Sequence, residues 1–302
     1  MLSLSISATS HGQNYLPVYY AESAGLFAER GLQVRIWDRD PWTDVLDDLA
    51  SGEADVVLGG LWVPAMYAGR GRDLVAVGQV NARFSKTVVT REPVPGFDWS
   101  WITGRTVLVP GAGGTAPYEF TASLIRAAGV DPAGARFVRD LSGAMLTELF
   151  LGGHGDAMVV DAFSAAKLST AGLAHETYRL AGPGGVMPNS VFYTAPHRLD
   201  TLEEPLAAFL SGLQQAMDDI NAGAPTSELL AEHWPAASEA ARAAATDELI
   251  RNGTWESVVI DEAACDRWMD VLREAGLVST AVDHSGIVDT RFIDRAFRGQ
   301  PA

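Results

Sequence analysis

Hydrophobic positions over the first 80 residues switch between the spacing of strands and the spacing of helices. Residues 2–8 alternate apolar and polar side chains, which predicts a strand, and residues 15–30 carry apolar side chains at helical spacing. Further strands are predicted at 32–37, 54–58 and 74–79, and a helix at 43–50. Such an alternation is typical of a mostly parallel sheet covered by helices.

A second unit of the same kind follows a loop at 93–104. The pattern predicts strands at 106–109, 136–139, 156–160, 177–181 and 191–194, and helices at 118–128, 144–151 and 162–170. After residue 199 it is helical, over 201–222, 225–233, 238–251, 260–275 and 290–297. This order favours a discontinuous first lobe. We predict that residues 1–90 and 195–302, with the C-terminal helices, form lobe 1 and that residues 91–194 form lobe 2.

Composition narrows the classes of partner. The 302 residues suggest two domains at ~100–200 residues each. The formal net charge of −16 disfavours nucleic acid and anionic membrane surfaces as partners. Cys265 is the only cysteine and the histidines lack metal-ligand spacing, so we predict no disulfide, metal or cofactor. The longest weakly polar run, residues 56–69, is too short for membrane insertion.

The N-terminus begins directly on the first predicted strand. It shows neither the basic start nor the long apolar stretch of an export signal. The chain as it stands is therefore expected in the cytoplasm, and outside it if a signal has been removed.

Unusual residues gather where the predicted strands end. In open α/β sheets, ligands bind outside the carboxyl ends of the strands. The candidate ligand-binding residues in these segments are Ser10, His11, Asn14, Trp62, Gly113, Gly114, Thr115, Asp161 and Asn189.

Several of these candidates have a structural interpretation beside the functional one. His11 either contacts a ligand or braces its loop. Trp62 follows two glycines, which favours an aromatic wall for a ligand over packing beneath the loop. Backbone N–H groups of residues 111–115 can hold an anionic oxygen before a helix, but a tight turn needs the same glycines. Asp161 either lies at the floor of a cleft or caps the helix that follows it.

Residues 111–116 also fit a dinucleotide fingerprint, with Asp140 downstream. Pro110 and Pro117 flank this loop, and the motif lies in mid-chain rather than in the first strand–helix–strand unit. A nicotinamide-dependent oxidoreductase is therefore a minor alternative.

Four segments resemble the type II periplasmic-binding-protein family that includes sulfonate-, nitrate- and thiamine-pyrimidine-precursor-binding proteins. They are LPVYYAESAGLFAERGLQV at 16–34, LASGEAD at 49–55, GGHGDA at 152–157 and TRFID at 290–294. The resemblance implies a two-lobed α/β fold with a helical C-terminal tail. It also implies a binding protein of the ABC-importer type, which closes on a small organic acid or heterocycle in the cleft between the lobes and meets a membrane permease.

The same fold also carries cytoplasmic enzymes, among them lyases, decarboxylases and a desulfinase acting on aromatic or heterocyclic acids. In such an enzyme His11 is the acid–base candidate, with Asn14 and Asp161 as helpers. The resemblance is incomplete here, because the nucleophilic cysteine of the desulfinase lies in the first loop, where this chain has Gly12. A pyrimidine-synthase-type mechanism needs a cysteine-rich cluster, which one cysteine cannot build. The sequence leaves binding protein and enzyme open.

Overall fold

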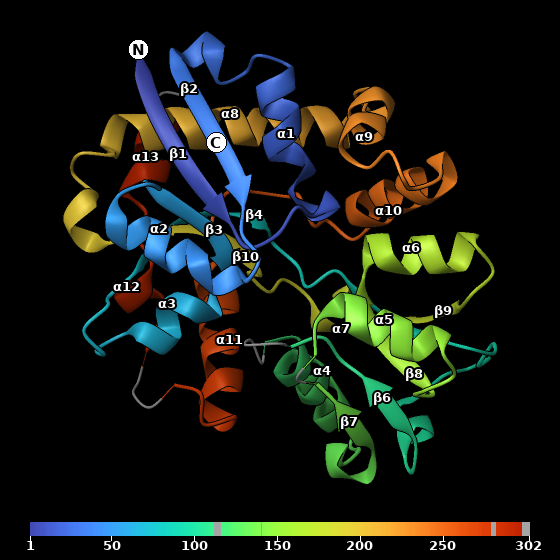
Figure 1. Cartoon of the computed structure of the whole chain (residues 1–302). Helices are drawn as coiled ribbons and strands as arrows, with labels where there is room; N and C mark the ends of the chain where they lie inside the picture. The colour runs from blue at the N-terminus through green and yellow to red at the C-terminus, as the bar shows by residue number, and fades with distance from the viewer. Residues whose placement is uncertain (112–115, 140, 279–281, 298–302) are drawn as a thin grey trace. The chain divides into compact units, whose positions relative to one another are not determined.

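A computed structural model describes residues 1–111, 116–139, 141–278 and 282–297 (Figure 1). Contacts within the chain divide it into two units. Unit 1 consists of Met1–Arg83, Val186–Leu229 and Gly253–Ala302. Unit 2 consists of Phe84–Gly185 and Leu230–Asn252. Each unit has its own five-stranded sheet.

The sheet of unit 1 has the strand order β2-β1-β3-β10-β4. Its strands are β1 (Leu2–Ala8), β2 (Leu32–Asp38), β3 (Val56–Gly60), β4 (Val75–Asn81) and β10 (Ser190–Thr194). β1 runs parallel to β2 and β3, while β10 is antiparallel to β3 and β4. The carboxyl ends of β1 to β4 therefore share one edge of the sheet with the start of β10.

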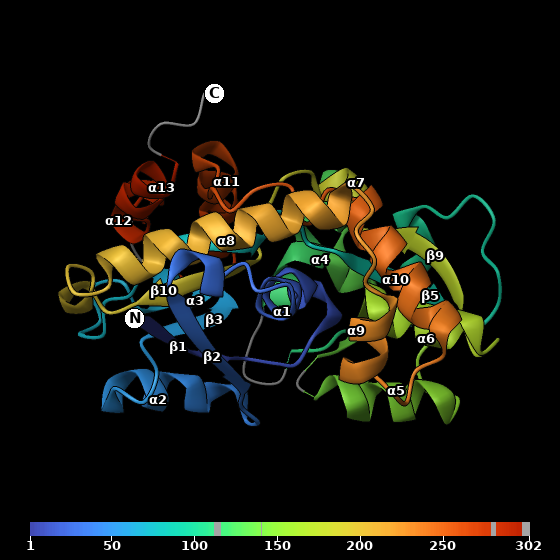
Figure 2. The ribbon, with the colours of Figure 1, turned by 90° about the horizontal axis from the view of Figure 1, so that it is seen from above.

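Helices cover both faces of this sheet. Figure 2 shows α8 (Glu203–Asn221) and α2 (Val45–Ser51) on opposite faces. The buried side of α8 includes Leu206, Phe209 and Leu213, which repeat at the spacing of one helix face. The remaining helices of unit 1 are α1 (Leu16–Ser23), α3 (Trp62–Tyr67), α11 (Glu262–Glu274), α12 (His284–Ile287) and α13 (Arg291–Ala296), and α9 (Ser227–His233) lies across the boundary between the units.

A buried carboxylate joins the first two strands of unit 1 to α2. Asp48 accepts hydrogen bonds from Ser7 Oγ at 2.6 Å, Trp37 Nε1 at 3.0 Å and Arg39 Nε at 2.8 Å. These donors, Arg39 above all, lower the pKa of Asp48 to about 2. The carboxylate therefore stays charged inside the unit because these donors outweigh the effect of burial.

Unit 2 repeats the topology of unit 1, with the strand order β7-β6-β8-β5-β9. Its strands are β5 (Lys86–Thr90), β6 (Thr106–Leu108), β7 (Arg136–Val138), β8 (Ala157–Asp161) and β9 (His175–Arg179). Its helices are α4 (Ala116–Ala127), α5 (Gly143–Leu151), α6 (Ala162–Thr170), α7 (Ala181–Gly184) and α10 (Glu239–Arg251). Phe150, Met158 and Leu108 lie in a core cluster that joins α5 to this sheet.

Several parts of the chain differ from the pattern-based expectation. The helix expected over 15–30 ends at Ser23, because Gly25 adopts a left-handed backbone conformation (φ 75°) that interrupts it. β5 was absent from the expected elements. Its sequence KTVVT is buried along four of its five residues, so it lacks the alternation of a half-buried strand.

The tail also divides differently. The sequence predicts that all of residues 195–302 return to lobe 1, but α10 packs on α6 in unit 2. Ala241 and Ala245 are buried on α10, and such small side chains let two helices approach closely. Within the described parts of the chain, no helix combines the length and apolar character needed to cross a membrane.

Candidate functional site

Strand direction brings five of the predicted site residues to one edge of the sheet in unit 1. They follow β1 and β3 or precede β10, and they are Ser10, His11, Asn14, Trp62 and Asn189. The N–H of Leu61 donates to the carbonyl of Asn189 at 3.1 Å, which ties the loop after β3 to the loop before β10. Ser10 and His11 are exposed, and the other three are half-buried. That these residues bind a ligand stays a prediction.

Asn14 belongs to a hydrogen-bonded network beneath this edge. With its amide oriented to satisfy both ends, Asn81 donates to the carbonyl of Asn14 at 2.8 Å and accepts from Asn14 Nδ2 at 2.7 Å and Ser190 Oγ at 3.1 Å. Trp255 Nε1, which is fully buried, donates to the same carbonyl at 2.9 Å. The network fixes Asn14 in place, because Asn81 holds both its carbonyl and its side chain while Trp255 holds the carbonyl from another segment.

Two glycines leave room for the side chains that the sequence singles out. A Cβ on Gly60 would lie 2.2 Å from Trp62 Nε1, so the indole rests against the backbone of β3. A Cβ on Gly12 would lie 2.2 Å from Asn14 Oδ1. Trp42 meets Trp62 edge-on at 5.3 Å between ring centroids, so two indoles stand together at this edge.

His11 has a bracing contact. Its ring stacks on Tyr19 at 5.1 Å, and its Nδ1 lies 3.4 Å from the Tyr19 hydroxyl. Burial raises the pKa of Tyr19, so the hydroxyl stays protonated at neutral pH. The contact supports the loop-bracing interpretation of His11, while the role of His11 towards a ligand stays a prediction.

In unit 2 the predicted site is only partly described. Asp161 caps α6, since its Oδ1 accepts from the N–H of Ser164 at 2.9 Å and its Oδ2 from Ser164 Oγ at 2.8 Å. That confirms the capping interpretation, and a ligand role for Asp161 stays a prediction. Gly113, Gly114 and Thr115 lie outside the described residues, as does Asp140 of the proposed dinucleotide fingerprint.

The sequence did not single out several residues that complete this edge. They are Tyr19, Trp42, Asn81, Ser190 and Trp255. Asn81 ends β4, so the strand-end rule could have found it. Trp255 is distant along the chain and carries no local signal for this position. Among the described residues, no three His, Cys, Asp or Glu side chains come together in a way that could hold a metal ion.

The sequence also matches a known protein family. The NMT1/THI5-like family matches residues 12–223, which is most of the chain. The chain belongs to the NMT1/THI5-like family. One relative is YtlA of Bacillus subtilis (strain 168), named "Putative binding protein YtlA", at 24% identity over 222 residues. The match covers 72% of this chain and 65% of YtlA, so it spans just under two thirds of the relative's length.

Solved structures confirm the type II periplasmic-binding-protein fold for this family member. The aliphatic sulphonate-binding protein SsuA from Escherichia coli is similar with a TM-score of 0.77 and 16% identity, over 98% of this chain and 99% of SsuA. The desulfurization enzyme DszB is similar with a TM-score of 0.68 and 13% identity, over 100% of both chains. Both a binding protein and an enzyme therefore share this fold, and at such identities the likeness concerns the fold alone.

Proposed function

We propose that this chain is the solute-binding component of an ABC-type importer and that it takes a small organic acid or heterocycle. The observation that carries the proposal is that one edge of the unit 1 sheet holds Trp62, the adjacent indole of Trp42 and the fixed amide of Asn14. Indole rings offer apolar area to a planar or aliphatic group, and an amide can both donate and accept hydrogen bonds. Membership in the NMT1/THI5-like family and similarity to YtlA, which is named a putative binding protein, support the same function.

The test measures binding and chemical change in the same samples. Purified protein is titrated calorimetrically with a panel of alkanesulfonates, nitrate, aminopyrimidines and aromatic carboxylates, and each ligand is then recovered and weighed by mass spectrometry. We expect one class to bind and to return unchanged. We expect Trp62→Ala to weaken that binding by about tenfold or more, as burial of an aromatic side chain predicts.

Trp101→Ala is the matched control, because Trp101 is also a half-buried indole but lies in unit 2, over Arg105. It should leave affinity within about twofold, which is less than the worth of one hydrogen bond. Failure of every ligand to bind, or equal effects of the two variants, would contradict the proposal.

The alternative is an enzyme on the same fold, for which the fold likeness to DszB is the specific observation. It predicts that a panel member is consumed and that His11→Ala slows turnover by ~10²–10⁴-fold while binding persists. Recovery of the bound ligand unchanged from both the wild type and His11→Ala would contradict this alternative.

A further inference from the structure

A cavity lies at the opposite edge of the unit 1 sheet from the candidate site. Its volume is about 740 Å³, within the range of small-molecule sites. It opens near the start of β4 and the end of β10, and every lining residue belongs to unit 1. The lining residues used below are Leu46, Leu49, Leu74, Arg72, His197 and Arg198.

The floor of the cavity is apolar. Leu46 and Leu49 come from α2, and Leu74 comes directly before β4. All three side chains are buried, with 3% to 7% of their surface exposed. Ala195 and Pro196 add apolar surface from the segment after β10. An aliphatic or aromatic group placed here would be removed from water and would contact apolar side chains, which is favourable.

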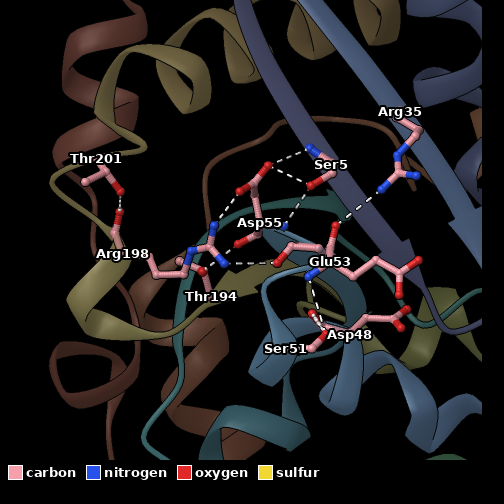
Figure 3. Close-up of polar contacts among 10 residues, drawn as sticks. Ser5, Arg35, Asp48, Ser51, Glu53, Asp55, Thr194, Arg198 and Thr201 are labelled. Atoms are coloured by element: carbon pink, nitrogen blue, oxygen red, sulfur yellow. Dashed lines mark hydrogen bonds and ion pairs between the residues drawn. The ribbon is translucent and has the colours of Figure 1, made fainter.

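Arg198 forms a fixed cationic wall. Its Nη2 lies 2.5 Å from Asp55 Oδ1 and its Nη1 donates to the carbonyl of Ala54 at 3.2 Å (Figure 3). Asp55 is itself held by the N–H and hydroxyl of Ser5, at 2.9 Å and 2.7 Å. Because both partners are anchored, the guanidinium needs no reordering to meet a ligand, although its charge is balanced by Asp55.

The rim also carries an arginine whose charge is not balanced by a carboxylate in this way. Arg72 is exposed and its guanidinium lies 6.0 Å from the ring of Tyr67, with no carboxylate within ion-pair distance among the described residues. His197 is exposed and also lines the cavity. Asp73 is the one acidic residue of the lining, and its Oδ1 accepts from the N–H of Gly69 at 2.9 Å. Although the chain has a formal net charge of −16, the local charge of Arg72 at this rim favours an anion.

We propose that this cavity is a second binding site, which takes a small amphipathic carboxylate. The apolar group would lie against Leu46, Leu49 and Leu74, and the carboxylate would meet Arg72 and His197 at the rim. An arginine–carboxylate pair is charge-assisted and can be bidentate, which gives the anionic end a defined position. The proposal is independent of the importer function, since it uses none of the residues at the candidate site.

The test uses octanoate as the probe and the full chain. Calorimetric titration should show saturable binding to the wild type, and Arg72→Glu should weaken it by at least about tenfold, because a charge-assisted contact is replaced by repulsion. Arg70→Glu is the matched control: it makes the same change of charge two positions away, outside the lining. It should leave octanoate affinity within about twofold, as expected of a screened exposed charge.

A second variant tests the cavity without touching its charge. Ala50 lines the cavity from α2 and is exposed, so Ala50→Trp should reduce octanoate binding by occupying the space while the unit stays folded. Octylammonium, which has the same chain and the opposite charge, should not bind. The absence of saturable octanoate binding, or equal losses in Arg72→Glu and Arg70→Glu, would overturn the proposal. Octanoate binding that persists in Trp62→Ala separates this site from the importer site.

Discussion

The same turn precedes a central strand in each unit, and the two copies are fastened differently. Asp55 precedes β3 and accepts from the N–H of Ser5 on β1 at 2.9 Å. Asp156 precedes β8 and accepts from the N–H of Thr106 on β6 at 2.8 Å. Because the two sheets have the same strand order, these carboxylates occupy equivalent places. A Gly-x-x-Asp turn therefore ties the amino end of the central strand to its parallel neighbour in both units.

An arginine after the neighbouring antiparallel strand completes each turn. Arg198, after β10, donates to the carbonyl of Ala54 and pairs with the Asp55 carboxylate. Arg91, after β5, donates to the carbonyls of His154 at 2.7 Å and Gly155 at 3.1 Å. Unit 1 thus adds an ion pair to a turn that unit 2 holds with neutral acceptors. The comparison teaches that one motif sets the strand pairing in both units. How much the motif stabilises each unit depends on the charge and burial around it.

Removing the better-fastened carboxylate should have the largest effect. Asp55→Ala deprives Ser5 and Arg198 of an acceptor at once, and we expect a loss of ~2–4 kcal/mol in the free energy of unfolding. Urea denaturation gives the magnitude, and hydrogen exchange resolved by peptide should show the loss of protection in β1 and β3 of unit 1. Equal loss of protection across both units would break the comparison.

Acid should weaken unit 1 through its other buried carboxylate. The pKa of Asp48 is lowered from 3.8 to about 2, so its stabilisation is present above pH ~4 and disappears as the pH falls towards ~2. The shift corresponds to roughly 2 kcal/mol. Asp48→Asn should be less stable than wild type at pH 7, and the difference should shrink as the pH approaches 2. A difference that is constant across this range contradicts the assignment.

Removing the carboxylate of the turn in unit 2 should destabilise the protein less than removing Asp55. Asp156 is exposed, and Arg91 holds the carbonyls of its turn without using the carboxylate. We expect Asp156→Ala to lower the free energy of unfolding by ~0.5–1.5 kcal/mol, the usual worth of one hydrogen bond. The measurement is the same urea series. A loss equal to that of Asp55→Ala would show that the ion pair with Arg198 adds nothing.

A buried carboxylate in unit 2 should show the smallest effect, and with the opposite sign. Burial raises the pKa of Glu119, against the opposing charges of Arg126 and Arg139, the second of which lies 3.9 Å away. A raised pKa in the folded state means that the charged form destabilises the fold. Glu119→Gln should therefore raise stability at pH 7 by up to ~1 kcal/mol, and the gain should vanish as Glu119 becomes protonated at lower pH. A loss of stability at pH 7 would contradict this sign.

Local pattern accounts for much of the fold. Strand alternation and the order of the elements predict both α/β units, and the position of LASGEAD and GGHGDA before two strands agrees with the equivalent turns. β5 could not be read in this way, since both of its faces are buried and its apolar residues do not alternate. The placement of α10 on α6 depends on packing between segments far apart in the chain, for which periodicity carries no information.

The candidate site was predictable to the same extent. The strand-end rule places Asn14 and Trp62 at one edge, because it depends only on strand direction. The network that holds Asn14 could not be predicted, since Trp255 and Asn81 reach it from other elements. The cavity beside Arg198 could not be predicted from the sequence for the same reason. Its floor and its rim come from separate segments, and each segment alone has the pattern of an ordinary helix, turn or loop.

The path of the chain between the units has a consequence for its synthesis on the ribosome. Unit 2 has all of its residues once Asn252 has been added, whereas unit 1 still lacks α11, α12 and α13. α13 packs on α8, which by then has long been translated. A nascent chain paused at this point carries a complete second unit and an α8 whose α13-facing surface is still uncovered. The stretch that follows Asn252 thus completes the unit whose strand β1 was translated before unit 2.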